Sequence, residues 1–179
     1  MSFPSDVLHF WFSELRPGDW FAVNPAVDQA IGARFRALYR AMKASPPDAA
    51  ILDSQGHLAA VIVFDQFPRN LFRGTADAFA TDPLALSLSR SAVLRGLDSG
   101  LGVHERQFLY MPHMHNEDPA VQVRSVELFA GLDLPDALLA ALEHKDAIDR
   151  FGRFPYRNKA LGRVSTPEEE AFLKTHPAS

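Results

Sequence analysis

Arginine and asparagine side chains gather in two short segments that share one pattern. The segments are FDQFPRN at residues 64–70 and FGRFPYRN at residues 151–158. Each contains Phe, two further residues, Phe-Pro and then Arg-Asn, with one extra residue in the second segment. Arginine binds carboxylates and phosphates through paired hydrogen bonds. The repeated pattern therefore predicts either an internal ion-pair clasp or a site for a small anion.

Asp65 is the first candidate for catalysis. It directly follows the apolar run Leu58–Phe64, so we expect its carboxylate to be at least partly buried. A buried carboxylate needs a cationic or hydrogen-bonding partner, or else it stays protonated. In one interpretation Asp65 and an arginine clasp the two segments together. In the other, Asp65 acts as an acid or base, or orients an arginine toward an anionic ligand. The candidate partners are Arg69, Arg73, Arg153 and Arg157.

Two histidines lie close together in the stretch FLYMPHMHNED at residues 108–118. Pro112 and Pro119 argue against a helix across this stretch, and in an extended segment His113 and His115 would face the same side. A metal site from both histidines and a carboxylate is one interpretation. No further ligand is indicated, however, so we favour a loop that lines a pocket, or a hydrogen-bonded structural histidine. We predict neither a metal nor a cofactor.

His144 lies on an apolar stripe of helical spacing with Ala141, Ile148 and Phe151, which leads into the second segment. A single histidine on such a face is usually a hydrogen-bonded residue of the core or of a pocket rim. The alternative is proton transfer, because the ordinary pKa of histidine lies near neutrality. Both interpretations stay open.

The elements that would position these side chains are helices. Four prolines follow a good N-cap residue, which predicts four helix starts. Glu169 would complete a capping box at the last of them. The four pairs are Asn24-Pro25, Asp82-Pro83, Asp118-Pro119 and Thr166-Pro167.

The run Leu58–Phe64 is ambiguous, since its β-branched residues would also suit a buried strand. No second strand of comparable strength is present, and one strand cannot make a sheet. The run therefore predicts a central helix that is apolar on all sides, and the chain as a whole is predicted to be all-α. In both patterned segments the proline is expected to end a helix at the residue before it, at Phe67 and Phe154.

Composition limits the classes of function. The chain of 179 residues is long enough for one domain with its own core, and it has no cysteine to form disulfides or a thiol nucleophile. A net charge of −4 argues against nucleic-acid binding. The start MSFPSDVLHFWF lacks the pattern of a signal peptide, and no apolar run could cross a bilayer. We expect a soluble, cytoplasmic protein with no nucleic-acid or membrane partner.

Three motifs in order resemble the bacterial domain-of-unknown-function family 924. They are DQFPRNLFRGTADAFATDPLAL at residues 65–86, FLYMPHMHNED at 108–118 and HKDAIDRFGRFPYRNKALGRVSTPEEEAFL at 144–173. The resemblance extends over about residues 7–173. It implies a fold similar to TPR-like α-superhelices of stacked helix pairs, in one helical domain over residues 1–179. It implies no established reaction, substrate or cofactor.

Two residues depart from the family pattern. His113 stands where the family usually has an apolar or aromatic residue, which weakens the metal interpretation. Tyr156 stands where the family often has histidine, which argues against a mechanism that needs a histidine there. The residues that match the pattern include Asp65, Gln66, Arg69, Asn70, Arg73, His115, Glu117, His144, Arg153, Arg157 and Asn158.

The preferred hypothesis is one polar pocket, built by the two patterned segments and residues 110–117, that binds a small anionic molecule and hydrolyses or isomerises it. Asp65, His115 and His144 are the predicted catalytic residues. The alternative is a non-enzymatic TPR-like module that binds a protein partner through its concave helical face, with purely structural motifs. The predicted ligand-binding residues are Gln66, Arg69, Asn70, Arg73, Tyr110, Glu117, Arg153, Arg157 and Asn158.

Overall fold

The computed structural model describes residues 3–175, and every regular element in that range is helical, which confirms the all-α prediction there. The α-helices are α1 (Phe3–His9), α2 (Pro25–Ala44), α3 (Ser54–Val61), α4 (Phe67–Leu71), α5 (Asp82–Leu94), α6 (Val103–Met114), α7 (Pro119–Ala130), α8 (Pro135–Phe151) and α9 (Pro167–Thr175). Two π-helical turns continue α1 and α3, at Phe10–Glu14 and Ile62–Gln66. Short 3-10 turns lie at Pro17–Asp19, Ala76–Phe79, Leu97–Gly100 and Pro155–Arg157.

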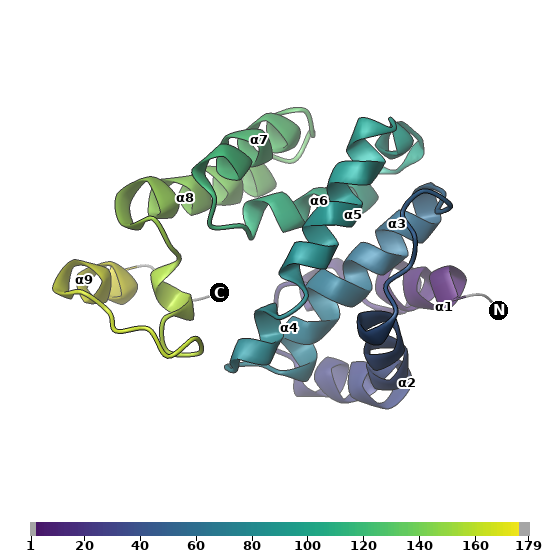
Figure 1. The fold of residues 1–179 in the computed structure, drawn as a ribbon, viewed down its shortest axis with the longest axis horizontal. Coiled ribbons are helices and arrows are strands. Elements are labelled where there is room, and N and C mark those ends of the chain that lie inside the picture. The colour runs from purple at the N-terminus through teal and green to yellow at the C-terminus, as the bar shows by residue number, and fades with distance from the viewer. Residues whose placement is uncertain (1–2, 176–179) are drawn as a thin grey trace.

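Helix α3 lies at the centre of the helical arrangement (Figure 1). It packs against α1, α5 and α6, and the later helices follow as neighbours, with α6 on α5, α7 on α6 and α8 on α7. Helix α9 lies apart from α1–α4 in Figure 1 and packs on the 3-10 turn Pro155–Arg157. The stacked helix pairs of a TPR-like superhelix stay a prediction.

The core is built around the apolar run Leu58–Phe64. Every residue of this run is fully buried, which confirms the prediction of a central helix that is apolar on all sides. Phe67 extends the run, and its ring centroid lies 4.9 Å from that of Phe35 and 5.9 Å from that of Trp11. Contacts of this kind add to the free energy gained from burying the rings.

All four predicted helix starts are confirmed, and at three of them the predicted capping side chains make their hydrogen bonds. Asn24 and Asp118 each accept a hydrogen bond from the backbone N–H two residues later, at 3.0 and 2.8 Å. Thr166 and Glu169 exchange hydrogen bonds of 3.2 and 2.8 Å as a capping box at the start of α9. These side chains satisfy N–H groups that the first turn of a helix leaves without partners.

At the fourth start the helix is present, but the prediction that Asp82 caps it with its side chain is wrong. Helix α5 begins at Asp82 itself, and the preceding Thr81 makes no capping hydrogen bond with its side chain. The carboxylate of Asp82 instead accepts hydrogen bonds from Arg69 and Arg157. Two guanidinium groups are stronger partners for a carboxylate than one backbone N–H.

The prediction that Pro68 ends a helix is also wrong. Helix α3 passes through the π turn Ile62–Gln66 into α4, and Pro68 lies in the first turn of α4, where its missing N–H is tolerated. The missing N–H leaves the carbonyl of Phe64, four residues earlier, without its usual helical donor. The buried hydroxyl of Thr81 donates to that carbonyl at 2.6 Å, so a hydrogen bond from another helix replaces the lost one.

The extended conformation predicted around the histidines is wrong as well. Helix α6 includes Pro112 and ends at Met114, so His113 is helical and His115 follows the last turn. Ser89 of α5 donates a hydrogen bond to the carbonyl of Leu109 in the turn that contains this proline. Packing against α5 thus keeps this stretch in a helical conformation, although Pro112 disfavours a helix there.

Gly152, rather than Pro155, ends the helix before the second patterned segment. Helix α8 extends to Phe151, and Gly152 has a φ of 66° and donates its N–H to the carbonyl of Ile148 at 2.8 Å. Glycine adopts this left-handed conformation without the strain that a Cβ atom causes. The two patterned segments therefore share their residues but not their backbone path.

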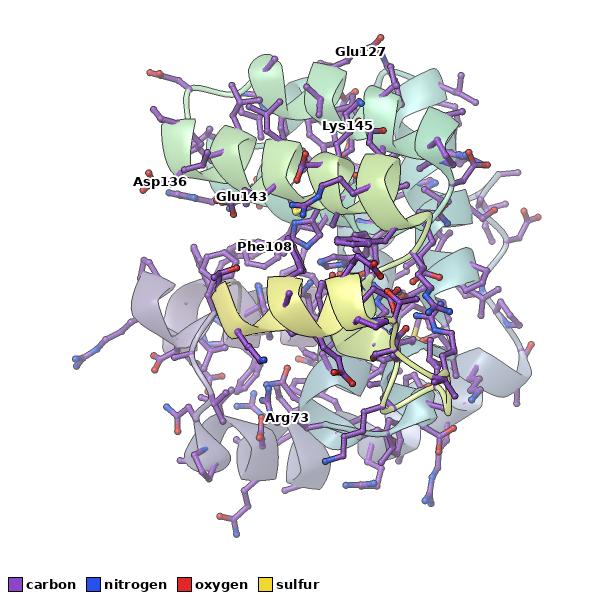
Figure 2. All side chains as sticks on the ribbon, turned by 90° about the vertical axis from the view of Figure 1, so that its left-hand side faces the viewer. Arg73, Phe108, Glu127, Asp136, Glu143 and Lys145 are labelled. Carbon is purple, nitrogen blue, oxygen red and sulfur yellow. The ribbon has the colours of Figure 1, made fainter. Side chains whose placement is uncertain are left out.

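Many charged side chains lie on the outside of the helices. Figure 2 shows Glu127, Asp136 and Glu143 on α7 and α8, and Arg73 at the opposite end of the view, whereas Phe108 lies in the interior between them. None of the helices in residues 3–175 is both long enough and apolar enough to cross a membrane.

Candidate active site

Asp65 lies in the π turn between α3 and α4 and is completely buried. Its Oδ1 lies 2.8 Å from His115 Nδ1 and 3.4 Å from Arg69 Nη1, and the amide of Gln66 donates to Oδ2. Burial alone would raise the pKa of Asp65, but the charge of Arg69 and the hydrogen bonds from His115 and Gln66 lower it below its ordinary range. Asp65 is therefore ionised at neutral pH.

His115 is the hydrogen-bonding partner of this carboxylate. Burial lowers the pKa of His115 more than the neighbouring Asp65 raises it, so the imidazole is neutral at pH 7. An ionised carboxylate can only accept hydrogen bonds, and Nδ1 must therefore carry the proton. Nε2 then keeps a free lone pair, which is the state in which a histidine acts as a base.

Asp82 connects two arginines from distant parts of the chain. It accepts hydrogen bonds from both terminal nitrogens of Arg69, at 2.9 and 3.1 Å, and from Arg157 Nη1 at 3.2 Å. Arg157 also donates Nη2 to the carbonyl oxygen of His115 at 2.9 Å. The clasp between the two patterned segments therefore exists, but Asp82 makes it rather than Asp65.

Arg157 makes cation–π contacts with two aromatic rings. Its guanidinium carbon lies 4.4 Å from the ring centroid of Phe79 and 4.9 Å from that of Phe154. Only 5% of the residue is exposed, and its Nε–H makes no hydrogen bond with any residue in the described range 3–175. A buried donor without a partner is costly, and no residue in the described range satisfies this N–H.

His144 and Tyr156 extend the cluster on the side of α8. His144 Nδ1 lies 2.8 Å from the carbonyl oxygen of Ala140, which fixes the proton on Nδ1 and leaves Nε2 free, as in His115. The ring centroids of the two histidines lie 6.2 Å apart, and that of Tyr156 lies 6.3 Å from that of His144. Burial lowers the pKa of His144 and raises that of Tyr156, so both are neutral at pH 7.

The other predicted ligand-binding residues make separate pairs outside this cluster. Asn70 and Arg73 both bind Asp28. Arg153 and Asn158 both bind Glu169. Tyr110 donates to Asp98 at 2.5 Å, and Glu117 accepts both terminal nitrogens of Arg163 at 2.9 Å. Of the four arginines predicted as partners for Asp65, Arg69 alone lies beside it.

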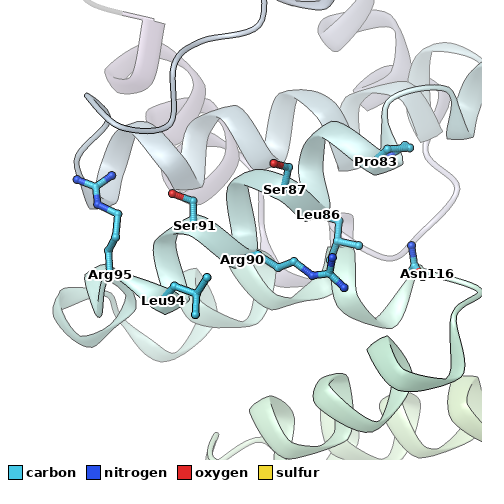
Figure 3. A pocket seen from close by; sticks show the side chains of 8 residues that line it. All are labelled: Pro83, Leu86, Ser87, Arg90, Ser91, Leu94, Arg95 and Asn116. Carbon is cyan, nitrogen blue, oxygen red and sulfur yellow. The ribbon is translucent and has the colours of Figure 1, made fainter.

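A surface groove of about 550 Å³ runs along the exposed side of α5, and Pro83 and Asn116 lie at one end of it (Figure 3). These two residues directly follow Asp82 and His115 in the sequence, so this end of the groove adjoins the buried cluster. The residues that line it are Pro83, Leu86, Ser87, Arg90, Ser91, Leu94, Arg95 and Asn116.

His113 and His115 do not share a site. His113 Nδ1 lies 3.2 Å from Ser89 Oγ in the interior, whereas His115 pairs with Asp65. No group of three or more His, Asp or Glu side chains in residues 3–175 has the arrangement of a metal site. The two-histidine metal interpretation fails because His113 is helical and its hydrogen bond is made to α5.

Sequence reasoning missed Asp82, Phe79 and a role for Tyr156 in this cluster. Asp82 precedes a proline at a helix start, a position at which aspartate usually caps the helix, and this hid its role as a partner of arginine. Phe79 belongs to no periodic stripe in the sequence. Tyr156 lies inside the second patterned segment, between Pro155 and Arg157, and this position was the available signal.

Two comparisons with known proteins gave matches. The family model described as bacterial protein of unknown function (DUF924) matches residues 7–176. The chain is also similar to the solved structure of the protein of unknown function ATU0120 from Agrobacterium tumefaciens. That likeness has 40% sequence identity and a TM-score of 0.90, and it covers 96% of this chain and 97% of the other. None of the curated proteins compared with the chain matches it.

Proposed function

The chain belongs to DUF924, a family of bacterial proteins of unknown function, and we propose that it is an enzyme in which His115 transfers protons on a small anionic molecule. The observation that carries the proposal is the 2.8 Å contact between His115 Nδ1 and Asp65 Oδ1 in the interior. A carboxylate that orients a neutral histidine and leaves its Nε2 free is the arrangement of a general base.

In the proposed reaction, His115 Nε2 takes a proton from a water molecule that attacks the substrate, or from a carbon of the substrate itself. The first step leads to hydrolysis and the second to isomerisation. Asp65 stabilises the imidazolium that forms, because its negative charge lies beside Nδ1. The imidazolium then returns the proton to the leaving group or to another carbon, which restores the starting state.

Arg69 and Arg157 would orient the anionic group of the substrate. Asp82 holds both guanidinium groups in place, and the Nε–H of Arg157 is a spare donor for a carboxylate or phosphate oxygen. The groove end at Pro83 and Asn116 supports this assignment, since it gives a small molecule a binding surface next to the cluster.

Ligand binding is tested by a thermal-shift screen with inorganic phosphate, phosphate monoesters and mono- and dicarboxylates. A compound present at 100 times its Kd should stabilise the protein by about 2.7 kcal/mol. The Arg157→Lys variant lacks the Nε–H and the planar fork, so the shift should largely disappear. Arg73→Lys is the matched control and should keep the shift, because Arg73 pairs with the distant Asp28.

Catalysis is tested by following turnover of the compounds that bind. Replacing His115 by Gln should lower kcat by about 10²–10⁴-fold, the usual contribution of a general base. His113→Gln is the control, since it also removes a buried histidine but not one in the cluster. The proposal fails if no anionic compound binds. It also fails if His115→Gln turns over the compounds as fast as His113→Gln does. In that event the non-enzymatic interaction module becomes the better description.

A further inference from the structure

Ser91 and His57 form a hydrogen-bonded pair at the other end of the α5 groove, away from Pro83 and Asn116. Ser91 Oγ lies 3.3 Å from His57 Nε2, and the two residues come from adjacent helices, α5 and α3. A serine hydroxyl in contact with a histidine nitrogen is the minimal arrangement for nucleophilic catalysis.

The tautomer of His57 follows from its second contact. His57 Nδ1 lies 2.9 Å from the backbone carbonyl oxygen of Asp53, which can only accept a hydrogen bond. Nδ1 therefore carries the proton, and Nε2 presents a lone pair to Ser91. The Ser91 hydroxyl must then donate to Nε2, which is the direction that activates a nucleophile. The carbonyl of Asp53 orients the imidazole as the carboxylate does in a Ser-His-Asp triad.

The two residues of the pair differ in burial, with His57 shielded from solvent and the Ser91 hydroxyl accessible. His57 is completely buried in α3, whereas Ser91 is partly exposed and lines the groove. Ser87, one turn earlier on α5, lines the same groove, and Figure 3 shows both serines on the same side of the helix. The contact with a histidine distinguishes Ser91 from Ser87.

The rest of the groove indicates the class of substrate. Leu94 is 86% exposed and offers apolar surface, and the largely buried Leu86 lines the groove beside it. Arg90 extends along the groove toward Asn116 in Figure 3. Arg95 is already engaged, because its Nη1 donates to the carbonyl oxygens of Ala49 and Leu52. The cation of Arg90 and the neighbouring leucines together suit a short carbon chain that ends in a carboxylate.

We propose that Ser91 is a nucleophile that accepts the acyl group of a small carboxylic ester whose acyl chain ends in a carboxylate. The Ser91 Oγ–carbon bond forms while the hydroxyl proton moves to His57 Nε2. The alcohol leaves with that proton as the ester carbon–oxygen bond breaks. Water then attacks the acyl-serine with the same help from His57, and the free acid leaves. This chemistry is separate from the proton transfer proposed for His115.

The first test is covalent trapping of the full chain with an alkyl fluorophosphonate, in which the serine oxygen displaces fluoride. Intact mass and peptide mapping should find one adduct, on Ser91. The Ser91→Ala variant should take up none, and Ser87→Ala should react as fast as the natural chain. His57→Gln should react about 100-fold more slowly, since it lacks the base. Thermal melting followed by circular dichroism shows whether the His57→Gln variant folds. If it does not fold, Ser91→Ala and Ser87→Ala alone test the proposal.

The substrate class is tested with two 4-nitrophenyl esters of four-carbon acyl groups, the hydrogen succinate and the butyrate. The succinate ester should release nitrophenolate faster than the butyrate ester. Arg90→Ala should reduce this rate ratio by about tenfold, without changing the rate with the butyrate ester.

Three results would overturn the inference. They are equal labelling of Ser87 and Ser91, an adduct that persists in Ser91→Ala, and no adduct under conditions that label an ordinary serine hydrolase. An Arg90→Ala variant that treats both esters like the natural chain would reject the proposed substrate class.

Discussion

Asp65 stays ionised in the interior because several groups together compensate its burial. Its position after an apolar run predicted both the burial and the need for a partner, and Arg69 is the arginine that lies beside it. Its partner His115 comes from 50 residues further along the chain. No local pattern predicts a contact of that kind, since it depends on how α3 and α6 pack.

Replacing Asp65 by Asn should lower the free energy of unfolding by about 3 kcal/mol, because it removes one charge from a buried, hydrogen-bonded group. Urea unfolding at pH 7 measures the change. Asp28→Asn is the matched control and should cost about 1 kcal/mol or less, since the Asp28–Arg73 pair is far more exposed. Equal losses in both variants would contradict the assignment of Asp65 as a buried charge.

His113 should make the protein less stable as the pH falls. Burial lowers the pKa of His113 to about 4 from its ordinary 6.5. Between these two values the unfolded chain binds a proton that the folded chain excludes, so the free energy of unfolding decreases as the pH drops. In His113→Gln the free energy of unfolding should fall less steeply with decreasing pH, by up to about 1.4 kcal/mol per pH unit. Urea unfolding between pH 7 and pH 4 measures both curves, and parallel curves would show that His113 does not contribute.

At the scale of elements, the prolines limited what the sequence could predict. Pro25, Pro119 and Pro167 start helices as expected, because the required side chains are close in sequence. Pro68 and Pro112 instead lie within helical stretches, where hydroxyl groups of Thr81 and Ser89 donate to carbonyls of those turns. Such donors come from a neighbouring helix, so only the packed structure reveals them.

The π turn that presents Asp65 should depend on Thr81. Replacing Thr81 by Val keeps the shape but leaves the buried carbonyl of Phe64 without a donor, which should cost about 1–3 kcal/mol. The control is Thr75→Val, because Thr75 makes the same kind of bond, to Phe72, at an exposed position. Thermal or urea unfolding compares the two variants. A Thr81→Val loss no larger than the control would mean that the turn is stable without this bond.

At the scale of the whole molecule, Glu169 fastens the C-terminal segment. It is nearly fully buried and accepts hydrogen bonds from Arg153, Asn158 and the backbone N–H of Thr166. Asp82 and Glu117 hold Arg157 and Arg163 of the same segment. The order of the three motifs in the sequence predicted the family, and the helix-start prolines and the absence of a second strand predicted the all-α class. The contacts between the motifs were not predictable, because acidic residues outside the two patterned segments bind the arginines of those segments.

Replacing Glu169 by Ala should loosen α9 and the residues before it, since three donors lose their acceptor. Hydrogen exchange measured by mass spectrometry should be at least about tenfold faster in residues 152–175 and unchanged in α3. Glu168→Ala, at the exposed neighbouring position, should exchange like the natural chain. Unchanged protection in the Glu169 variant would show that apolar contacts alone hold the segment.

The protonation state of His115 tests the proposed acid–base site most directly, and it requires no knowledge of the substrate. A long-range ¹H–¹⁵N correlation spectrum of the labelled chain reports which imidazole nitrogen carries a proton, and His115→Gln assigns the signal. We predict a neutral ring at pH 7 with the proton on Nδ1 and a free lone pair on Nε2. A proton on Nε2, or an imidazolium at that pH, would leave the site without a base and contradict the proposal.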